Sequence, residues 1–200
     1  MSPTDLKIFS LIPENARVLD VGCGDGSLLK LLAKSKGVLP LGLEIDIERI
    51  KDCVVNKVPV LQMDIDHGLK GFSNNQFDVA ILKFTISEVR QPLELLHEIL
   101  RVARSVIVVI SNFAYWKVRW SLLLRGRMPI TNDLPYEWHD TPNIHLLSMA
   151  DIEDICQKEG VEIMHRECFA PHTVERILIK CGYPNFAANS ALYHLRKQEL

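Results

Sequence analysis

A glycine-rich turn between an apolar run and a helical pattern most constrains what this chain can fold into. The apolar run is Arg17–Val21, which has the length and the valine content of a buried strand. Glycines follow at positions 22, 24 and 26, and leucines at helical spacing follow from Leu28 to Leu32. Glycines let a backbone approach a ligand closely, and a helix N-terminus presents free N–H groups. This order of elements therefore predicts a ligand site at the end of the first strand of an α/β sheet.

The spacing of these glycines narrows the class of ligand. The dinucleotide fingerprint G-x-G-x-x-G would need a glycine at position 27, where this chain has Ser27. A P-loop is excluded because no G-K-[ST] follows the glycines. The pattern is D-x-G-x-G-x-G instead, and the acid at its start, Asp20, suits a ligand with a cationic amino group more than a pyrophosphate. A nicotinamide-dependent oxidoreductase therefore has only the generic glycine turn in its favour.

Strand and helix patterns alternate along the chain, which is typical of a parallel sheet with crossover helices. Further strands are expected at residues 39–45, 58–63, 77–82, 106–110, 161–166 and 191–196. Helices are expected at about 46–55, from Pro92 onward, and from a capping box at Ser148 to a stop at Gly160. The apolar face of the helix that begins at Pro92 comprises Leu93, Leu96, Ile99, Leu100 and Ala103. Residues 1–200 are therefore expected to form a single α/β domain.

Composition and charge exclude several classes of partner. The 23 basic residues nearly cancel the 25 acidic ones, so the net charge of −2 creates no field that attracts nucleic acid or anionic lipid. The longest apolar run, residues 106–110, is far shorter than the roughly 20 residues of a membrane-spanning helix. The first residues lack the basic and apolar regions of a secretory signal. We therefore expect a cytoplasmic protein that binds neither nucleic acid nor membrane.

The five cysteines are scattered and none forms a Cys-x-x-Cys pair, so they fit neither a disulfide framework nor a zinc site. We expect reduced thiols. Cys23 lies in the glycine turn, where a helix N-terminus often lowers the pKa of a thiol. A reactive thiol and a side chain that fills the turn both fit this position, and we expect the second.

The regular pattern breaks at about residues 111–147, a segment too long for a plain connection. All three tryptophans of the chain lie in it, so it has apolar side chains to bury. We expect an ordered insertion over the carboxyl ends of the strands, as a lid or a docking face. Trp116, Trp120 and Leu123 form an apolar stripe at helical spacing, which we expect to pack against the core of the domain.

From about Arg17 to Arg196 the sequence resembles the class I S-adenosylmethionine (SAM) methyltransferase superfamily. The resemblance implies a Rossmann-like three-layer sandwich with a seven-stranded, mostly parallel sheet, whose last two strands form an antiparallel edge pair. It also implies that SAM or S-adenosylhomocysteine binds at the ends of the strands. Asp20, Gly22 and Gly24 would then line the methionine part of the ligand. Glu44 would accept hydrogen bonds from both ribose hydroxyls, and Asp64 would lie near the adenine amine. Ile45, Ile65 and Lys83 complete the residues expected around the cofactor.

Amino-methylating members of this superfamily carry an [DNS]-P-P-[YFW] motif after the fourth strand. This chain has Leu82-Lys83-Phe84-Thr85 at that place, so methylation of an amine is disfavoured.

The insertion carries a narrower resemblance. The runs LLLRGRMPIT (122–131), LPYEW (134–138) and DTPNIHL (140–146), together with GLEID at 42–46, are similar to the MetW family of methionine biosynthesis proteins. This resemblance implies a SAM-methyltransferase-like protein that works with homoserine O-acyltransferase. The chain departs from the family at Lys83-Phe84-Thr85, where a small polar run is expected.

Two hypotheses for the function follow. In the first, the chain is a SAM-binding partner or activator of homoserine O-acyltransferase; in the second, it methylates a small, carboxylate-bearing acceptor. Residues expected at a substrate or partner are Trp116, Arg119, Arg125, Arg127 and Trp138, because arginines pair with carboxylates. Candidates for acid–base catalysis are Tyr136, His139 and His145. We expect no metal, since neither histidine has an acid or cysteine at ligand spacing.

Overall fold

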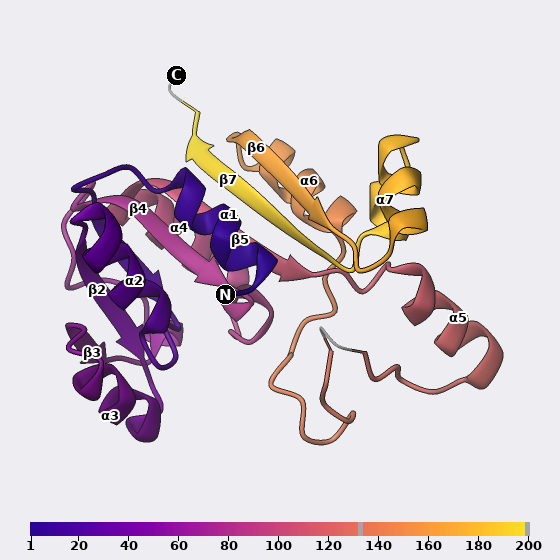
Figure 1. The fold of residues 1–200 in the computed structure, drawn as a ribbon, viewed down its shortest axis with the longest axis horizontal. Helices are drawn as coiled ribbons and strands as arrows, with labels where there is room; N and C mark the ends of the chain where they lie inside the picture. The colour runs from indigo at the N-terminus through magenta and orange to yellow at the C-terminus, as the bar shows by residue number, and fades with distance from the viewer. Residues whose placement is uncertain (132–133, 199–200) are drawn as a thin grey trace.

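The computed structural model describes residues 1–131 and 134–198, which form one seven-stranded sheet (Figure 1). The strands are β1 (Arg17–Val21), β2 (Leu39–Glu44), β3 (Val60–Gln62), β4 (Phe77–Lys83), β5 (Ala103–Ser111), β6 (Val161–Phe169) and β7 (Ser190–Lys197). Their order in the sheet is β3-β2-β1-β4-β5-β7-β6. The first five strands are parallel, whereas β7 is antiparallel to both β5 and β6. The predicted sheet with an antiparallel edge pair is confirmed.

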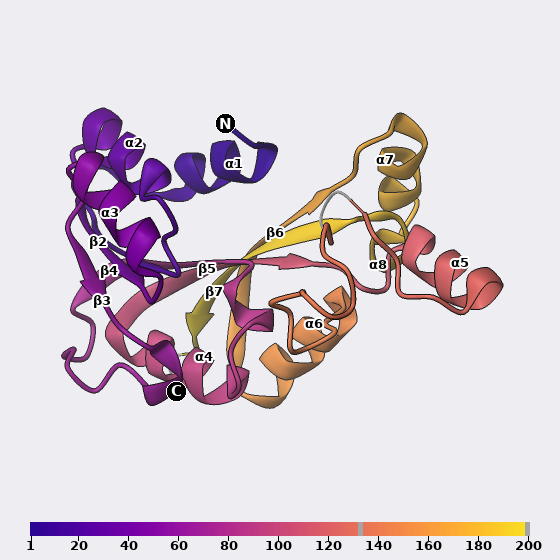
Figure 2. The ribbon, with the colours of Figure 1, turned by 90° about the horizontal axis from the view of Figure 1, so that it is seen from below.

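Helices cover both faces of this sheet and make the predicted three layers. They are α1 (Pro3–Leu11), α2 (Ser27–Lys36), α3 (Ile47–Val55), α4 (Pro92–Val102), α5 (Trp116–Arg125), α6 (Met149–Lys158), α7 (Thr173–Lys180) and α8 (Pro184–Ala187), with short 3-10 turns at η1 (Ile65–His67) and η2 (Thr85–Ser87). Figure 2 shows α1, α2 and α3 on one face and α4 and α6 on the other. Among the described residues, no helix is long and apolar enough to span a bilayer.

The apolar run of the central strand β5 contributes side chains to two hydrophobic cores, one on each face of the sheet. Val106, Val108 and Ile110 pack with residues of α4 and α6, whereas Ile107 and Val109 pack with residues of α1 and α2. Successive side chains of a strand point to opposite faces, so a strand between two helical layers needs a continuous apolar run. The run at 106–110 is therefore the strand that the sequence predicted, and the structure extends it at both ends.

Helix α1 was not predicted from the sequence, although its start carries a signal. Asp5 N–H donates to the Ser2 hydroxyl at 3.1 Å, and Ser2 N–H donates to the Asp5 carboxylate at 3.0 Å. This reciprocal capping box, followed by Pro3 at the first helical position, fixes the N-terminus of the helix. Ile8 then packs beneath the sheet and is fully buried. Helices α7 and α8, between β6 and β7, were also not predicted.

The predicted apolar face of α4 needs a correction at both ends. Leu93 is 41% exposed, and the buried side chains of the helix are Leu95, Leu96, Ile99, Leu100 and Val102. Because Pro92 begins the helix, Leu93 lies in its first turn and points away from the sheet. Ala103 is the first residue of β5 and not part of the helix. The edge strand β3 is shorter than the predicted 58–63.

The insertion begins with α5, which lies beside α8 beyond the end of the sheet (Figure 2). The predicted packing of its stripe against the core is wrong for two residues, since Trp120 is 47% and Leu123 is 74% exposed. The buried side of α5 is instead carried by Val118, next to Tyr115 in a small cluster of its own. The helix projects past the main core, so its stripe has no strand to pack against.

Glu175 of α7 holds the start of α5 in place. Its carboxylate is buried and accepts hydrogen bonds from the Tyr115 hydroxyl and, at 2.9 Å, from Trp116 Nε1. It also accepts from His172 N–H at 3.1 Å, as part of the cap of α7. Burial alone would raise the pKa of Glu175, but these donors outweigh it and lower the pKa. The insertion is thus anchored to the C-terminal part of the fold.

Candidate functional site

A cleft of 840 Å³ opens at the carboxyl ends of the parallel strands, where ligands bind in open α/β sheets. The glycine turn after β1 forms one wall, the ends of β2, β3 and β4 form the floor, and the returning part of the insertion forms the opposite wall. All eight residues predicted around a cofactor line this cleft: Asp20, Gly22, Gly24, Glu44, Ile45, Asp64, Ile65 and Lys83. The structure therefore brings together residues from four separate segments of the chain.

The first glycine of the turn, Gly22, is required because the side chain of Thr85 lies close to it. Gly22 has a φ of +77°, and a Cβ at this position would lie 2.6 Å from the hydroxyl oxygen of Thr85. Thr85 is itself fixed, because its hydroxyl donates to the carbonyl of Val21 at 2.9 Å. A side chain at position 22 would therefore be strained by its backbone and would also collide with η2.

Cys23 fills the turn, as expected. Its thiol is buried, lies 3.8 Å from the sulfur of Cys53, and would be 2.4 Å from a Cβ at Gly42. Burial and the charge of Asp20 raise the pKa of Cys23, so the thiol stays protonated and is a poor nucleophile. The reactive alternative has no support in this geometry.

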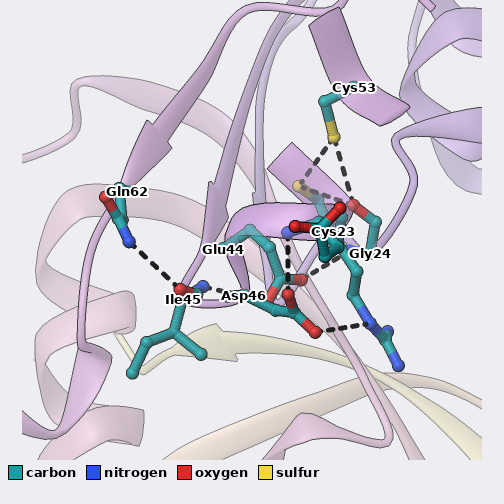
Figure 3. A network of polar contacts seen from close by, with 9 residues as sticks. Cys23, Gly24, Glu44, Ile45, Asp46, Cys53 and Gln62 are labelled. Carbon is teal, nitrogen blue, oxygen red and sulfur yellow. Dashed lines mark hydrogen bonds and ion pairs between the residues drawn. The ribbon is translucent and has the colours of Figure 1, made fainter. Parts of the chain in front are cut away.

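Glu44 joins the end of β2 to the glycine turn (Figure 3). One carboxylate oxygen accepts from Gly24 N–H at 2.9 Å, and the other accepts from Ile45 N–H at 2.9 Å and from Asp46 N–H at 3.1 Å. The side chain is 7% exposed, and a carboxylate has about four acceptor positions. Three are used by the backbone, which leaves capacity for a ligand hydroxyl. This bracing role within the fold was not foreseen from the sequence.

Asp20 is a buried acid whose hydrogen-bonding capacity is unused. Its Oδ1 atom has no hydrogen-bond partner among the described residues, although the side chain lines the cleft. Burial raises the pKa of Asp20 to about 7, the charge of Lys83 opposes this rise, and the charges of Glu44 and Asp5 add to it. A buried carboxylate in this state gains from a cationic donor. The site therefore fits a ligand with an ammonium group.

The remaining cofactor candidates form the rest of the floor. Lys83 ends β4, is half-buried, and makes an ion pair with Asp5 of α1 at 2.5 Å. Asp64 caps η1 by accepting from Asp66 N–H at 3.0 Å, and its other oxygen faces His67 Nδ1 at 3.1 Å. Ile65 packs against the core beside it. Asp64 is exposed, so it has free surface toward the cleft.

The insertion is pinned to η2 at the mouth of the cleft. The hydroxyl of Ser87 donates to the side-chain oxygen of Asn143 at 2.7 Å, and the N–H groups of Ile144 and His145 donate to the carbonyl of Ser87 at 2.8 and 3.0 Å. These contacts place Asn143 and Tyr136 in the wall opposite the glycine turn.

The three candidates for acid–base catalysis do not all lie at the cleft. Tyr136 lines the cleft, whereas His139 and His145 are not among its lining residues. His139 is exposed, with Nδ1 3.6 Å from a carboxylate oxygen of Glu137. The Nε2 atom of His145 is buried and has no hydrogen-bond partner among the described residues. The geometry thus leaves Tyr136 as the candidate that meets a ligand.

The five residues predicted at a substrate or partner also lie outside the cleft lining. Trp116 belongs to the Glu175 network, and Arg119 lies over the ring of Phe186 at 5.6 Å. Arg125 and Arg127 are exposed, and Trp138 is 77% exposed. Apart from Trp116, which packs against the cluster of Tyr115 and Val118, these side chains are exposed at the surface outside the cleft.

Sequence reasoning missed further lining residues, among them Arg49, Glu88 and Asp140. A signal existed for Arg49, which lies in the first turn of α3, the helix that follows the acid of β2. Glu88 directly follows η2, and Asp140 belongs to the insertion. The positions of these two segments depend on long-range contacts and have no local pattern.

Comparisons with known proteins agree with this architecture. The model of the family described as "Methionine biosynthesis protein MetW" matches residues 4–195. The bifunctional methionine biosynthesis protein MetXA/MetW of Rhodopirellula baltica is 34% identical in an alignment of 201 positions that covers 96% of this chain and 32% of that protein. This chain therefore spans just under a third of the length of that relative.

Solved structures show the fold at lower identity. An S-adenosylmethionine-dependent methyltransferase from Mesorhizobium loti superposes with a TM-score of 0.70 at 16% identity and covers 96% of each chain. The phosphoethanolamine N-methyltransferase 2 of Haemonchus contortus, in complex with SAM, has a TM-score of 0.65 at 16% identity, over 98% of this chain and 52% of that one. On the sequence match over residues 4–195 and on this fold, the chain belongs to the MetW family of methionine biosynthesis proteins, built on the class I SAM-dependent methyltransferase architecture.

Proposed function

We propose that this chain binds SAM in the cleft and acts as a partner and activator of homoserine O-acyltransferase. The ligand's ammonium would meet Asp20, and one of its ribose hydroxyls would meet the remaining acceptor position of Glu44. Its adenine would lie in the region of Asp64 and Ile65. The unpartnered Oδ1 of Asp20 is the observation that best supports this cofactor. SAM supplies an activated methyl group when bound, but the proposed partner role needs only its binding.

The bifunctional MetXA/MetW protein of Rhodopirellula baltica supports the choice of homoserine O-acyltransferase as the partner. A MetW-like sequence covers 32% of the Rhodopirellula protein, whose name also contains MetXA. Fusion of two functions in one chain is expected where the two units work together. The insertion offers suitable side chains, because Leu123, Leu124 and Trp138 are 74%, 72% and 77% exposed. Exposed large apolar groups rimmed by arginines are typical of protein–protein contacts.

An active methyltransferase is the second candidate, and the cleft wall favours it. Tyr136, Asp140 and Asn143 lie in the same cleft as the cofactor candidates. An acceptor bound between the insertion and the glycine turn would therefore meet polar groups. Arg49 also lines this space and would suit a carboxylate of the acceptor. The absence of the amine-binding motif after β4 directs this candidate toward an acceptor other than an amine.

Co-purification separates the two candidates. The chain is mixed with homoserine O-acyltransferase from the same source, and the mixture is analysed by size-exclusion chromatography with light scattering, with and without SAM. The partner function predicts a joint peak whose mass is the sum of the components. Separate peaks under both conditions would reject the partner function. Incubation of the chain with methyl-labelled SAM and a source extract then tests for a methylated product.

A further inference from the structure

Asp20 and Lys83 carry opposite charges and lie on the same face of the sheet, at the part of the cleft proposed for the amino-acid group of the ligand. Asp20 of β1 is in register with Ile81 of β4, and Lys83 lies two residues farther along β4. Side chains alternate along strands with a period of two, so Asp20, Ile81 and Lys83 point to the same face. That face is covered by α1 and α2, and both charged residues line the cleft.

Lys83 is held in this place by α1. The carboxylate of Asp5 receives the Lys83 ammonium at 2.5 Å, and Asp5 is fixed by its capping box with Ser2. An ammonium has three N–H donors, and within the described residues Asp5 is its hydrogen-bond acceptor. Two donors are therefore available at the cleft. The Lys83 side chain is 31% exposed, so these donors are accessible but only partly solvated.

Lys83 is a positive charge among several negative charges at this part of the cleft. The charges that act on Asp20 are those of Glu44 and Asp5, which are negative, and that of Lys83, which is positive. An uncompensated carboxylate of a ligand would be repelled by the three acids. Lys83 is the cation that acts on Asp20 and offsets this repulsion, whereas Arg49, the other basic side chain among the described lining residues, lies beside Gly24. A zwitterionic amino-acid group matches the pair, with its ammonium on Asp20 and its carboxylate on Lys83.

We infer that Lys83 receives the carboxylate of the bound ligand, and that Asp5 of α1 is the positioning residue that presents it. The inference rests on the proposed binding of SAM, and it assigns α1 to the ligand site. It makes the site selective for a ligand with an intact amino-acid end. Decarboxylated SAM keeps the adenosine, the sulfonium and the ammonium but lacks the group that Lys83 would bind, so it is the matched probe.

Isothermal titration calorimetry with the two ligands tests this assignment. The unaltered chain should bind SAM about ten-fold or more tightly than decarboxylated SAM, the scale of one charge-assisted hydrogen bond. Lys83→Met should lose this preference, because SAM binds more weakly while decarboxylated SAM binds as well or better. Lys83→Arg, which keeps the charge, should retain a preference for SAM. Lys70→Met is the control, since Lys70 is exposed and does not line the cleft.

Asp5→Asn tests the positioning role by the same measurement, the ratio of the affinities for SAM and for decarboxylated SAM. The asparagine oxygen still caps α1, but it no longer attracts the ammonium, so the preference for SAM should shrink while decarboxylated SAM binding holds. Circular dichroism melting curves show whether each variant is folded at the temperature of the titration. Any variant that melts below that temperature is compared at a lower one, where it is folded.

The outcomes distinguish this inference from the proposed function. If the unaltered chain binds neither ligand, SAM binding itself is rejected and the assignment of Lys83 goes with it. If the unaltered chain binds both ligands equally, SAM binding stands and the assignment of Lys83 is overturned. If folded Lys83→Met loses affinity equally for both ligands, the assignment is also overturned, because the lysine would then support only the shape of the cleft.

Discussion

The carboxylate of Glu44 accepts a hydrogen bond from the backbone N–H of Gly24 at 2.9 Å, and so links the end of β2 to the turn after β1. These two residues are twenty positions apart in the chain, and Gly24 belongs to a wall of the cleft whereas Glu44 belongs to its floor. The same carboxylate accepts two N–H groups at the start of the segment leading into α3. One acid therefore organises the turn, and in the proposed function it would also present an oxygen to the ligand.

Replacement of Glu44 by alanine should affect both binding and stability. We expect SAM affinity to fall by about 1.5–3 kcal/mol, the range for a lost hydrogen bond to a charged group. The melting temperature should also fall, because three backbone N–H groups lose their acceptor. Titration calorimetry and thermal melting measure the two effects. Glu48→Ala is the control, since Glu48 is exposed and its ion pair within the described part of the chain is with Lys51. Unchanged SAM affinity in Glu44→Ala would remove Glu44 from the ribose site.

Gly22→Ala should be far more damaging than the same change at another left-handed glycine. Gly160 has a φ of +63°, and no described atom lies within 4 Å of the place that a Cβ would occupy, so Gly160→Ala carries only the backbone cost of roughly 1–2 kcal/mol. Gly22→Ala carries that cost and a collision with Thr85. We expect a larger loss in denaturant unfolding and no measurable SAM binding. Equal destabilisation of the two variants would show that the contact with Thr85 relaxes without cost.

The state of Asp20 predicts a pH dependence. Because burial raises its pKa from 3.8 to about 7, the folded chain binds one more proton than the unfolded chain between these values. The free energy of unfolding contributed by this group therefore decreases as pH rises through that window. A ligand ammonium needs the ionised acid, so SAM affinity should rise by about ten-fold per unit below pH 7 and then level off. Calorimetry from about pH 5.5 to about pH 7.5 measures this slope.

Asp20→Asn provides the comparison for that slope. The amide does not titrate, so SAM affinity should be weak and nearly independent of pH. All other groups of the chain are the same in both proteins, so their contributions cancel in the difference. A flat profile in the unaltered chain, or an equal slope in Asp20→Asn, would contradict the assignment of the ammonium to Asp20.

Trp138 tests the insertion as a contact surface. Its side chain is 77% exposed, so Trp138→Ala should change the free energy of unfolding by less than about 0.5 kcal/mol. Binding to homoserine O-acyltransferase should nevertheless weaken by about ten-fold or more, as expected for a large aromatic side chain at an interface. Leu39→Ala is the control, because Leu39 is 65% exposed at the start of β2, away from the insertion. Equal affinity of Trp138→Ala and the unaltered chain would exclude this tryptophan from the contact.

The parts of the fold that were predictable are those with a local signal. The apolar run at residues 106–110 and the glycines after β1 define a strand and a turn without reference to distant residues, and both are present. The family resemblance implied that Asp20, Glu44 and Asp64 surround a ligand, and the structure brings all three to the cleft at the edge where the parallel strands end.

The parts that were not predictable depend on long-range contacts. The apolar stripe of α5 gives no sign of whether a core or solvent faces it, and Glu175, which fixes that helix, is 60 residues from Tyr115. The pairing of Asp5 with Lys83 joins residues that are 78 positions apart in the chain. No local pattern connects them, so the contact of α1 with Lys83 was not predicted.

The proposed partner function is tested most sharply by the rate of homoserine O-acyltransferase at a fixed enzyme concentration, with increasing amounts of this chain and with SAM present or absent. We predict that the rate rises to a plateau near a stoichiometric ratio and that SAM changes the plateau or the amount of chain needed to reach it. Asp20→Asn should abolish the response to SAM while the chain still associates. A rate that is independent of this chain at every ratio, with and without SAM, would contradict the partner function.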